Sequence, residues 1–328
     1  MQSEITYPID AVITWVNGND TNHQKKMRRY LNDVSLIKNK KFNTRFYQVE
    51  EIEYAIKSIV KFAPYIRYIF LVTDHQKPLF LEKYLKHKKD RGPVVILVDH
   101  TVIFKGFESY LPTFNSVSIE SMLHRIPNLA EHFVYFNDDF FLISPTKPDD
   151  FFKEGIPIIR GDWSRFDEDK YYKVIYKKAL KIIGKLSKDK KLGYKKAQQN
   201  AARLLDFDSY IRLDHTPSAM RKSTISNYFL KFPRKLIHNA EFRFREPSQF
   251  MIQSLANHLE VKSQTFVLKN QFQLQYFGSY RKPLYWYRMH MFISEKRKKT
   301  LFLCLQSLDL SPNRIQRYFL TWLNKNSS

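Results

Sequence analysis

Four apolar runs near the start of the chain each lead into a carboxylate. They span residues 9–16, which continue into the turn Asn17–Asp20, and residues 68–74, 94–100 and 132–139. Short runs rich in Val, Ile, Phe and Tyr that end on Asn, Gly or Asp are typical of buried strands. In an open α/β sheet, ligands bind outside the carboxyl ends of the strands. The pattern therefore predicts a sheet that gathers acidic groups at one edge.

Segments with helical spacing separate these runs. Apolar residues recur at intervals of three and four over 49–60, 79–85 and 119–126, and a proline follows the first and third segments. Strands that alternate with helices imply βαβ units and a mainly parallel sheet. We predict an α/β fold with a Rossmann-like sheet. Neither G-x-G-x-x-G nor G-x-x-x-x-G-K-[ST] occurs, so the phosphates of any bound nucleotide must be held in another way.

Composition divides the chain into three parts. Residues 1–150 are expected to form the Rossmann-like nucleotide-binding layer, 151–212 a basic helical insertion, and 213–328 the completion of one catalytic unit, with apolar helices at 301–308 and 315–323. Lysines are dense from Lys170 to Lys196, and apolar residues keep helical spacing from Tyr171 to Leu186. Such a helix is either a solvated face or a docking surface for an anionic membrane or a polyanionic acceptor.

The formal charge of +23 over 328 residues indicates an anionic partner, which could be nucleic acid, an acidic membrane surface or a phosphorylated substrate. No helix-turn-helix, zinc spacing or ribonucleoprotein motif supports nucleic acid. The single cysteine, Cys304, excludes an intramolecular disulfide and favours a reducing compartment. The first residues lack a signal-peptide pattern, and no apolar run approaches the ~18 residues of a spanning helix. We expect a soluble or peripherally attached cytoplasmic protein.

The run at 132–139 ends on Asn137, Asp138 and Asp139. Two adjacent carboxylates can hold a hard divalent cation that neutralises a diphosphate, although Asn and Asp are also favoured in turns for local reasons. His215 is a candidate general base, since imidazole titrates near neutral pH, but a single histidine is more often structural.

Several blocks together resemble the Stealth family of hexose-1-phosphate transferases, which also includes the lysosomal-enzyme GlcNAc-1-phosphotransferase α/β precursor. The first block is Ile9–Asp20, close to I-D-x-V-x-T-W-V-D-G-x-D. The second runs from Arg45 to Asp139, and the third from His215 to Phe250. Asn17 departs from the usual Asp, Gln48-Val49 replaces an Asp-Asn pair, and Cys304–Ser307 only partly matches the fourth block, C-[IL]-N-D.

The resemblance implies a GT-A-like sheet and transfer of a hexose-1-phosphate from a UDP-sugar to a hydroxyl of a lipid-linked or polymeric glycan, with release of UMP and with Mg²⁺ or Mn²⁺ as cofactor. It would place the protein on the inner face of the cell membrane. The alternatives are an ordinary glycosyltransferase that releases UDP, or a basic nucleic-acid-binding protein. Candidate residues are catalytic His215, Arg243, Asp10 and Asp139; donor-binding Thr14, Trp15, Asn115, Asn137, Arg125, Arg245 and Glu246; and metal-binding Asp138 and Asp139.

Three of these assignments stay open. Asp10 is either catalytic or an ordinary strand-end acid that contacts the nucleotide ribose. Trp15 is either a core residue or a stacking partner for uracil. Arg243 and Arg245 both offer a planar guanidinium that suits phosphate oxygens, and the match to Arg-x-x-Glu-x-x-Gln favours Arg243.

Overall fold

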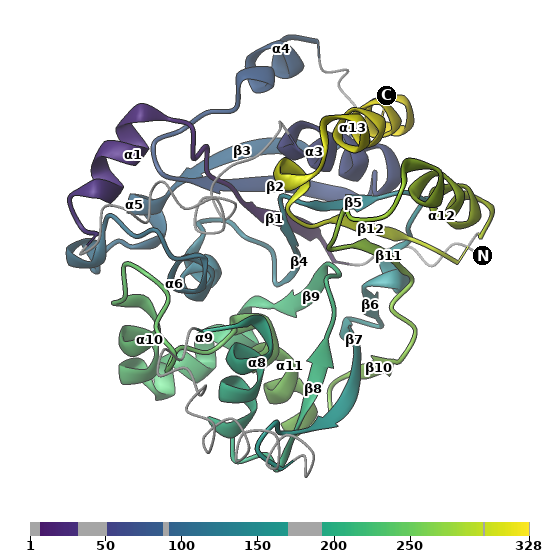
Figure 1. The fold of residues 1–328 in the computed structure, drawn as a ribbon. Coiled ribbons are helices and arrows are strands. Elements are labelled where there is room, and N and C mark those ends of the chain that lie inside the picture. Colours follow the sequence, from purple (N-terminus) through teal and green to yellow (C-terminus); the bar gives the residue numbers. More distant parts are fainter. Residues whose placement is uncertain (1–6, 32–50, 88–91, 170–191, 298, 328) are drawn as a thin grey trace, which may run out of the picture.

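The computed structural model describes residues 7–31, 51–87, 92–169, 192–297 and 299–327. Its centre is a five-stranded sheet (Figure 1). The strands are β1 (Ile9–Thr14), β2 (Ile66–Thr73), β3 (Val94–Asp99), β4 (His132–Asn137) and β9 (Ser218–Arg221), in the order β3-β2-β1-β4-β9. The first four are parallel and β9 is antiparallel to β4. The four predicted strands and the mainly parallel sheet are confirmed.

Strand β1 lies between β2 and β4, so the chain builds one side of the sheet first and then returns to the other. This reversal is the topological switch point at which α/β sheets bind ligands. Thr14, the last residue of β1, pairs with Val72 in β2 and with Asn137 in β4. The crevice at the switch point is therefore flanked by the residues that follow Thr14 and Asn137.

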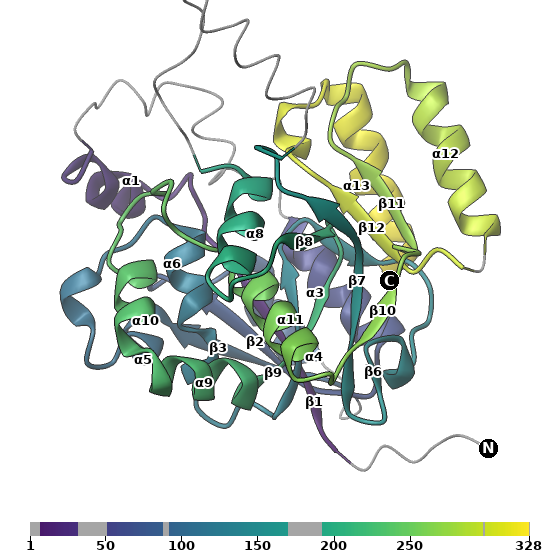
Figure 2. The same cartoon turned by 90° about the horizontal axis from the view of Figure 1, so that it is seen from below.

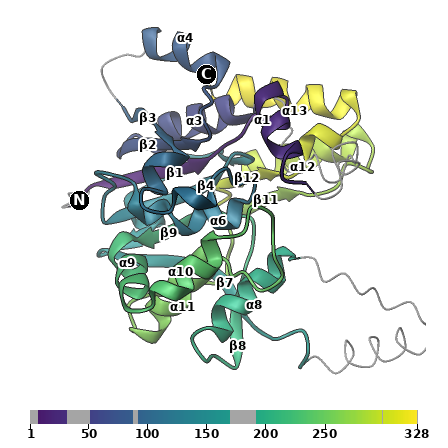
Figure 3. The same ribbon diagram turned by 90° about the vertical axis from the view of Figure 1, so that its left-hand side faces the viewer.

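Helices cover both faces of the central sheet, as Figure 3 shows. Alternation along β1 sends Ala11 and Ile13 into one apolar cluster with Ile52 of α3 (Glu51–Phe62), and Val12 into the other cluster with Met122. The second face is covered by α6 (Ser116–Ser121), α9 (Lys222–Lys231), α10 (Pro233–Ala240) and α11 (Ile252–Lys262) (Figure 2). This alternation is the period of two expected for a strand buried on both faces.

The predicted helices of the first part of the chain are present. They are α3, α4 (Leu79–His87) and α6, which is followed by a separate 3-10 turn at Leu123–Arg125. The remaining short elements are α1 (Thr21–Arg28), α5 (His100–Ile103) and 3-10 turns at Glu108–Tyr110, Pro148–Asp150 and Leu308–Leu310.

The segment 151–212, expected to be helical, also contains strands. A second sheet joins β6 (Phe152–Lys153), β7 (Ile156–Arg165), β8 (Ser209–Leu213) and β10 (Val267–Lys269), beside helix α8 (Tyr194–Arg203). The lysine-rich helix predicted around 171–186 lies outside the described residues. In the described ranges, no helix is long and apolar enough to cross a membrane.

A third sheet links the C-terminal region to the centre of the molecule. It consists of β11 (Leu274–Phe277), β12 (Phe302–Leu305) and β5 (Phe140–Leu142), and it packs against α12 (Leu284–Lys296) and α13 (Asn313–Ser327). The helix predicted at 301–308 is wrong, because residues 302–305 form β12. A short, wholly apolar run is compatible with either element, and β12 is buried along its whole length between two partners. The helix predicted at 315–323 is confirmed within α13.

Candidate active site

The residues Asn137, Asp138 and Asp139 form a turn between β4 and β5, hereafter the aspartate turn. Asp139 is held from the C-terminal sheet: its backbone oxygen accepts from the Leu305 amide at 3.2 Å, and its Oδ2 accepts from Cys304 Sγ at 3.7 Å. Asp139 Oδ1 is buried and has no hydrogen-bond partner among the described residues. A buried carboxylate oxygen without a partner costs free energy unless a ligand completes it.

The two carboxylates of the aspartate turn are electrostatically strained. Burial raises the pKa of Asp138 to about 7, and the neighbouring charge of Asp139 adds to this rise. Burial also raises the pKa of Asp139. A divalent cation would relieve both the repulsion and the missing contact, and carboxylate oxygens are the ligands that Mg²⁺ and Mn²⁺ prefer. The side chains present here therefore fit such an ion.

A polar chain crosses the switch point from β1 to β4. Thr14 Oγ1 lies 2.9 Å from Tyr135 OH, which donates to Asn137 Oδ1 at 2.8 Å. These contacts fix the side chains of Thr14 and Asn137 at the carboxyl edge of the sheet. Trp15, by contrast, is only 8% exposed and packs in the core with Ile13, so little of its ring is accessible to a base.

Glu120 of α6 is a buried acid near this chain that the sequence analysis did not select. Its Oε2 accepts from Gln253 Nε2 at 2.9 Å. Burial raises the pKa of Glu120, against the opposing effects of the Gln253 hydrogen bond and the positive charge of Arg245. In the sequence, the only indication of a special role for Glu120 is its position as an acid within the apolar helical pattern of residues 119–126.

His215 lies between two parallel tyrosine rings. Its ring centroid is 4.7 Å from that of Tyr194 and 4.9 Å from that of Tyr276, with interplanar angles of 14° and 7°. Phe140, which directly follows Asp139, meets the same imidazole edge-on at 6.4 Å. His215 and the aspartate turn are therefore neighbours, although 76 positions separate His215 from Asp139 in the sequence.

The aromatic sandwich changes the chemistry of His215. Burial lowers its pKa below the ordinary histidine value, and the charge of Asp214 opposes this only in part. A neutral imidazole at pH 7 can accept a proton, as a general base must. Neither Tyr194 nor Tyr276 could be selected from a sequence with 20 tyrosines, because only tertiary structure brings them to His215.

The partly matching fourth block contacts this site. Tyr276 OH donates to Gln306 Oε1 at 2.5 Å, and Gln306 is itself fixed by a backbone bond from its amide to Phe277 O at 3.0 Å. Cys304 contacts Asp139 as described above. Thus Cys304 and Gln306 support the aspartate turn and the His215 sandwich, respectively, despite the departure from the family pattern.

The two candidate arginines are held differently. Arg243 Nη2 donates to the carbonyls of Ser109 and Leu111 at 2.9 and 3.3 Å, and its guanidinium lies 4.7 Å from the Tyr30 ring centroid. Arg245 is exposed, and its Nη2 donates to Ser116 Oγ at 3.0 Å. Arg245 is therefore the guanidinium with more donors free for a ligand, and it is also the one whose charge acts on Glu120.

Three further candidates have structural partners. Asn115 is fully buried; it caps α6 and donates to Gln249 Oε1 at 2.9 Å. Arg125 bonds the Lys105 carbonyl and covers the Phe107 ring at 4.7 Å. Glu246 donates its amide to Gln249 Oε1 at 2.9 Å, and its side chain is half-buried.

Asp10 lies near the amino end of β1, away from the aspartate turn. Its fully buried carboxylate accepts from Arg67 at 3.0 and 2.7 Å and from the amides of Tyr68 and Ala130 at 3.2 and 2.7 Å. The structure does not bring it to the other candidate catalytic residues. Its contacts join β1, β2 and the loop before β4, which is a structural function.

Replacing Asp10 with Ala should lower the free energy of unfolding by about 3–5 kcal/mol, because the change leaves Arg67 and two amides without their buried acceptor. The matched control is Asp162→Ala, which removes an exposed pair with Arg212 at 3.1 Å and should cost less than about 1 kcal/mol. Urea unfolding of both variants measures the difference. An equal decrease in the free energy of unfolding in both variants would show that the buried contacts of Asp10 stabilise the fold no more than an exposed ion pair does.

Comparison with known proteins identifies two conserved regions in the chain. Residues 7–35 match Stealth protein conserved region 1, and residues 45–158 match conserved region 2. A capsular polysaccharide phosphotransferase of Haemophilus influenzae is 45% identical over 150 residues, which are 44% of this chain and 38% of the relative. An exopolysaccharide phosphotransferase of Streptomyces coelicolor is 32% identical over 262 residues, 79% of this chain and 40% of the relative. The alignments thus span about two fifths of these curated relatives.

Among solved structures, the bifunctional glycosyltransferase WbbM matches with a TM-score of 0.47 and 10% identity, over 93% of this chain and 46% of that one. At this distance the likeness carries no argument about function. The two conserved regions include the aspartate turn and the β1 edge, which agrees with the resemblance found in the sequence. The chain therefore carries Stealth conserved regions 1 and 2 at residues 7–35 and 45–158.

Proposed function

We propose that the protein transfers a hexose-1-phosphate or N-acetylhexosamine-1-phosphate from a UDP-sugar to a hydroxyl of a growing cell-surface polysaccharide. The acceptor oxygen would bond to the phosphorus next to the sugar, the phosphoanhydride would break, and UMP would leave. The observation that carries the proposal is the strained aspartate turn beside a neutral His215, in a chain that is 32–45% identical to polysaccharide phosphotransferases.

Asp138 and Asp139 would hold the metal. A bound Mg²⁺ or Mn²⁺ would supply positive charge that stabilises the donor diphosphate and the leaving UMP. Cys304 and Leu305 would keep Asp139 in place through the contacts to its side chain and its backbone. Thr14, Tyr135 and Asn137 would present the adjoining polar edge to the nucleotide.

His215 would take the proton of the acceptor hydroxyl at an imidazole nitrogen, because its lowered pKa keeps it unprotonated at neutral pH. The flanking tyrosines would hold the ring plane and exclude water. Arg245 would stabilise charge on the transferring phosphoryl group through its free donors, and Arg243 would anchor the strand of chain that carries it. The contacts of the two arginines thus favour Arg245 as the phosphate ligand, whereas the sequence pattern favours Arg243.

The formal charge of +23 favours binding of anionic partners. For the proposed reaction, these partners would be the donor, the phosphodiester product and the inner membrane leaflet. We propose a peripheral location on that leaflet. A nucleic-acid partner lacks any supporting sequence motif.

The nucleotide released decides between the proposal and an ordinary glycosyltransferase. Purified protein should be incubated with a panel of UDP-sugars, an oligosaccharide acceptor and Mg²⁺ or Mn²⁺, and the products analysed for UMP and UDP and by phosphorus NMR. We expect UMP together with a phosphodiester resonance, and neither with the His215→Ala variant. UDP with a glycosidic product would establish the alternative, and UMP without a phosphodiester would indicate donor hydrolysis instead of transfer.

A further inference from the structure

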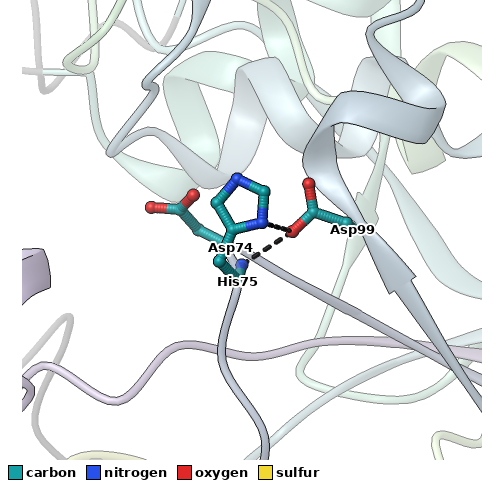
Figure 4. Close-up of side chains that lie close together, drawn as sticks. All are labelled: Asp74, His75 and Asp99. Atoms are coloured by element: carbon teal, nitrogen blue, oxygen red, sulfur yellow. Dashed lines mark hydrogen bonds and ion pairs between the residues drawn. The ribbon is translucent and has the colours of Figure 1, made fainter.

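A second group of metal-ligating side chains lies at the same edge of the sheet. Asp74 and His75 directly follow β2, and Asp99 ends β3. Because Thr73 pairs with Asp99, these side chains emerge next to one another (Figure 4). Strand β1 separates β2 from β4, and two strand spacings amount to about 10 Å, so this group is distinct from the aspartate turn.

His75 is held against Asp99 by two contacts. Its amide donates to Asp99 Oδ2 at 2.7 Å, and its Nδ1 lies 2.9 Å from the same oxygen. The backbone of His75 has φ of 52°, in the left-handed region that few non-glycine residues adopt, although histidine is enriched there. Such a conformation persists only where surrounding contacts enforce it, and it is often found at ligand sites.

The spacing of the three side chains suits a metal ion. One ligand atom from each of Asp74, His75 and Asp99 lies within 4.8 Å of the others. Zinc binds imidazole nitrogen and carboxylate oxygen at about 2.0–2.2 Å, which places two ligands of one ion roughly 3.0–3.4 Å apart. The 2.9 Å between His75 Nδ1 and Asp99 Oδ2 is close to that separation. An ion could therefore enter between these two atoms with little movement of His75 or Asp99.

Asp74 keeps acceptor capacity despite an ion pair. Lys26 Nζ lies 3.1 Å from both of its oxygens, which occupies two of about four lone-pair positions. Burial opposes ionisation of Asp74, but hydrogen bonds with His23 and Lys26 outweigh it and hold its pKa well below the usual range. With two contacts from Lys26 and one from His23, at least one lone-pair position of Asp74 remains for a cation.

Space for the ion's remaining ligands adjoins the group. A pocket of about 370 Å³ is lined by Asp74 and His75 together with Asp20, Asn22, His23, Lys25, Lys26, Arg29 and Gln76. The His75 side chain is 60% exposed, so its imidazole is accessible from solvent. Water or a small anion could occupy the open coordination positions beside the lysines.

We propose that Asp74, His75 and Asp99 bind one divalent transition-metal ion, with Zn²⁺ as its chemical type, at a site separate from the aspartate turn. An imidazole with two carboxylates suits zinc, whereas Mg²⁺ is usually bound through oxygens alone. The proposal does not depend on the transfer reaction, because it concerns binding at other residues.

The test is titration of the metal-stripped full chain with Zn²⁺, by calorimetry and by competition with a fluorescent chelator. We expect one ion bound through this site in the wild type and at least a tenfold weaker affinity in His75→Ala and Asp99→Asn. The matched control is His238→Ala, which removes an exposed histidine paired with Glu241 at 3.4 Å and should bind zinc like the wild type. Asp138→Asn should also leave this affinity unchanged.

A second substitution of His75 separates loss of zinc binding from loss of the folded structure. Asn tolerates the left-handed backbone better than Ala, so His75→Asn should keep the thermal midpoint while it weakens zinc binding. Wild-type zinc affinity in a folded His75→Asn or His75→Ala variant would overturn the proposal. A zinc stoichiometry that falls only in Asp138→Asn and not in His75→Asn would overturn it too, by placing the bound zinc at the aspartate turn.

Discussion

Asp138→Asn should abolish sugar-phosphate transfer and at the same time raise the thermal midpoint of the metal-free protein at pH 8. The loss of turnover should reach at least ~10²–10³-fold, since an active-site group that stabilises developing charge contributes about that much. The rise in stability follows from removing one of two buried, mutually repelling carboxylates. A residue that lowers stability while supporting activity is expected at a catalytic site.

The pH dependence of this effect has a defined sign. The pKa of Asp138 rises from an ordinary value of 3.8 to about 7 in the folded chain, so the folded state binds the proton more tightly than the unfolded state. Its ionisation therefore destabilises the fold progressively as pH rises from about 4 to about 7. The gain from Asp138→Asn should be larger at pH 8 than at pH 5, and saturating Mg²⁺ should raise the wild-type midpoint more at pH 8.

Thermal unfolding in chelator and UMP production in Mg²⁺ measure the two effects. The matched control is Asp309→Asn, because burial raises the pKa of Asp309 to about 6 while its hydrogen-bond partners are its own backbone and that of Leu310. That variant should also gain stability at pH 8, yet retain turnover. Full activity of Asp138→Asn, or activity of the wild type in excess chelator, would contradict a metal-binding role.

His215→Ala should lower kcat by about 10²–10⁴-fold with little change in donor affinity, the contribution typical of a general base. The wild-type rate should rise with pH through the pKa of His215. Because burial lowers that pKa, the acidic limb should have its midpoint below the ordinary histidine value of 6.5. Rate profiles and calorimetry with a UDP-sugar measure both quantities.

Two substitutions of Tyr276 separate stacking from hydrogen bonding. Tyr276→Ala uncovers one face of His215, which should raise the imidazole pKa and move the acidic limb toward 6.5. Tyr276→Phe removes only the bond to Gln306 and should leave the limb near its wild-type position. If His215→Ala instead loses donor binding and keeps the acidic limb, His215 is a diphosphate ligand and another group is the base.

The sequence was sufficient to predict the four strands and the aspartate turn, because each strand is a local apolar run ended by polar residues. It misassigned β12, where the same apolar residues suit a helix or a buried strand and only the partners β5 and β11 decide. Asp10 matches the family pattern, but its contacts with Arg67 show why an acid belongs there.

The rest of the candidate site depends on contacts between distant residues. Tyr194 and Tyr276 belong to α8 and β11, and nothing in their local sequence indicates a shared histidine. Arg243 and Arg245 have the same chemistry and differ only in what surrounds them. Spacing cannot report such surroundings, because they are set by the loop at 109–111 and by α6.

Strand β5 follows Asp139 without an intervening loop and pairs with β12, whereas β4 before the turn belongs to the central sheet. The two sheets are thus joined by a single short step of the backbone, and the carboxylates of Asp138 and Asp139 lie on that step. Their separation is fixed only while both sheets are intact. Partial opening around β12 would therefore displace these carboxylates and, under the proposed function, would stop turnover while most of the chain stayed folded.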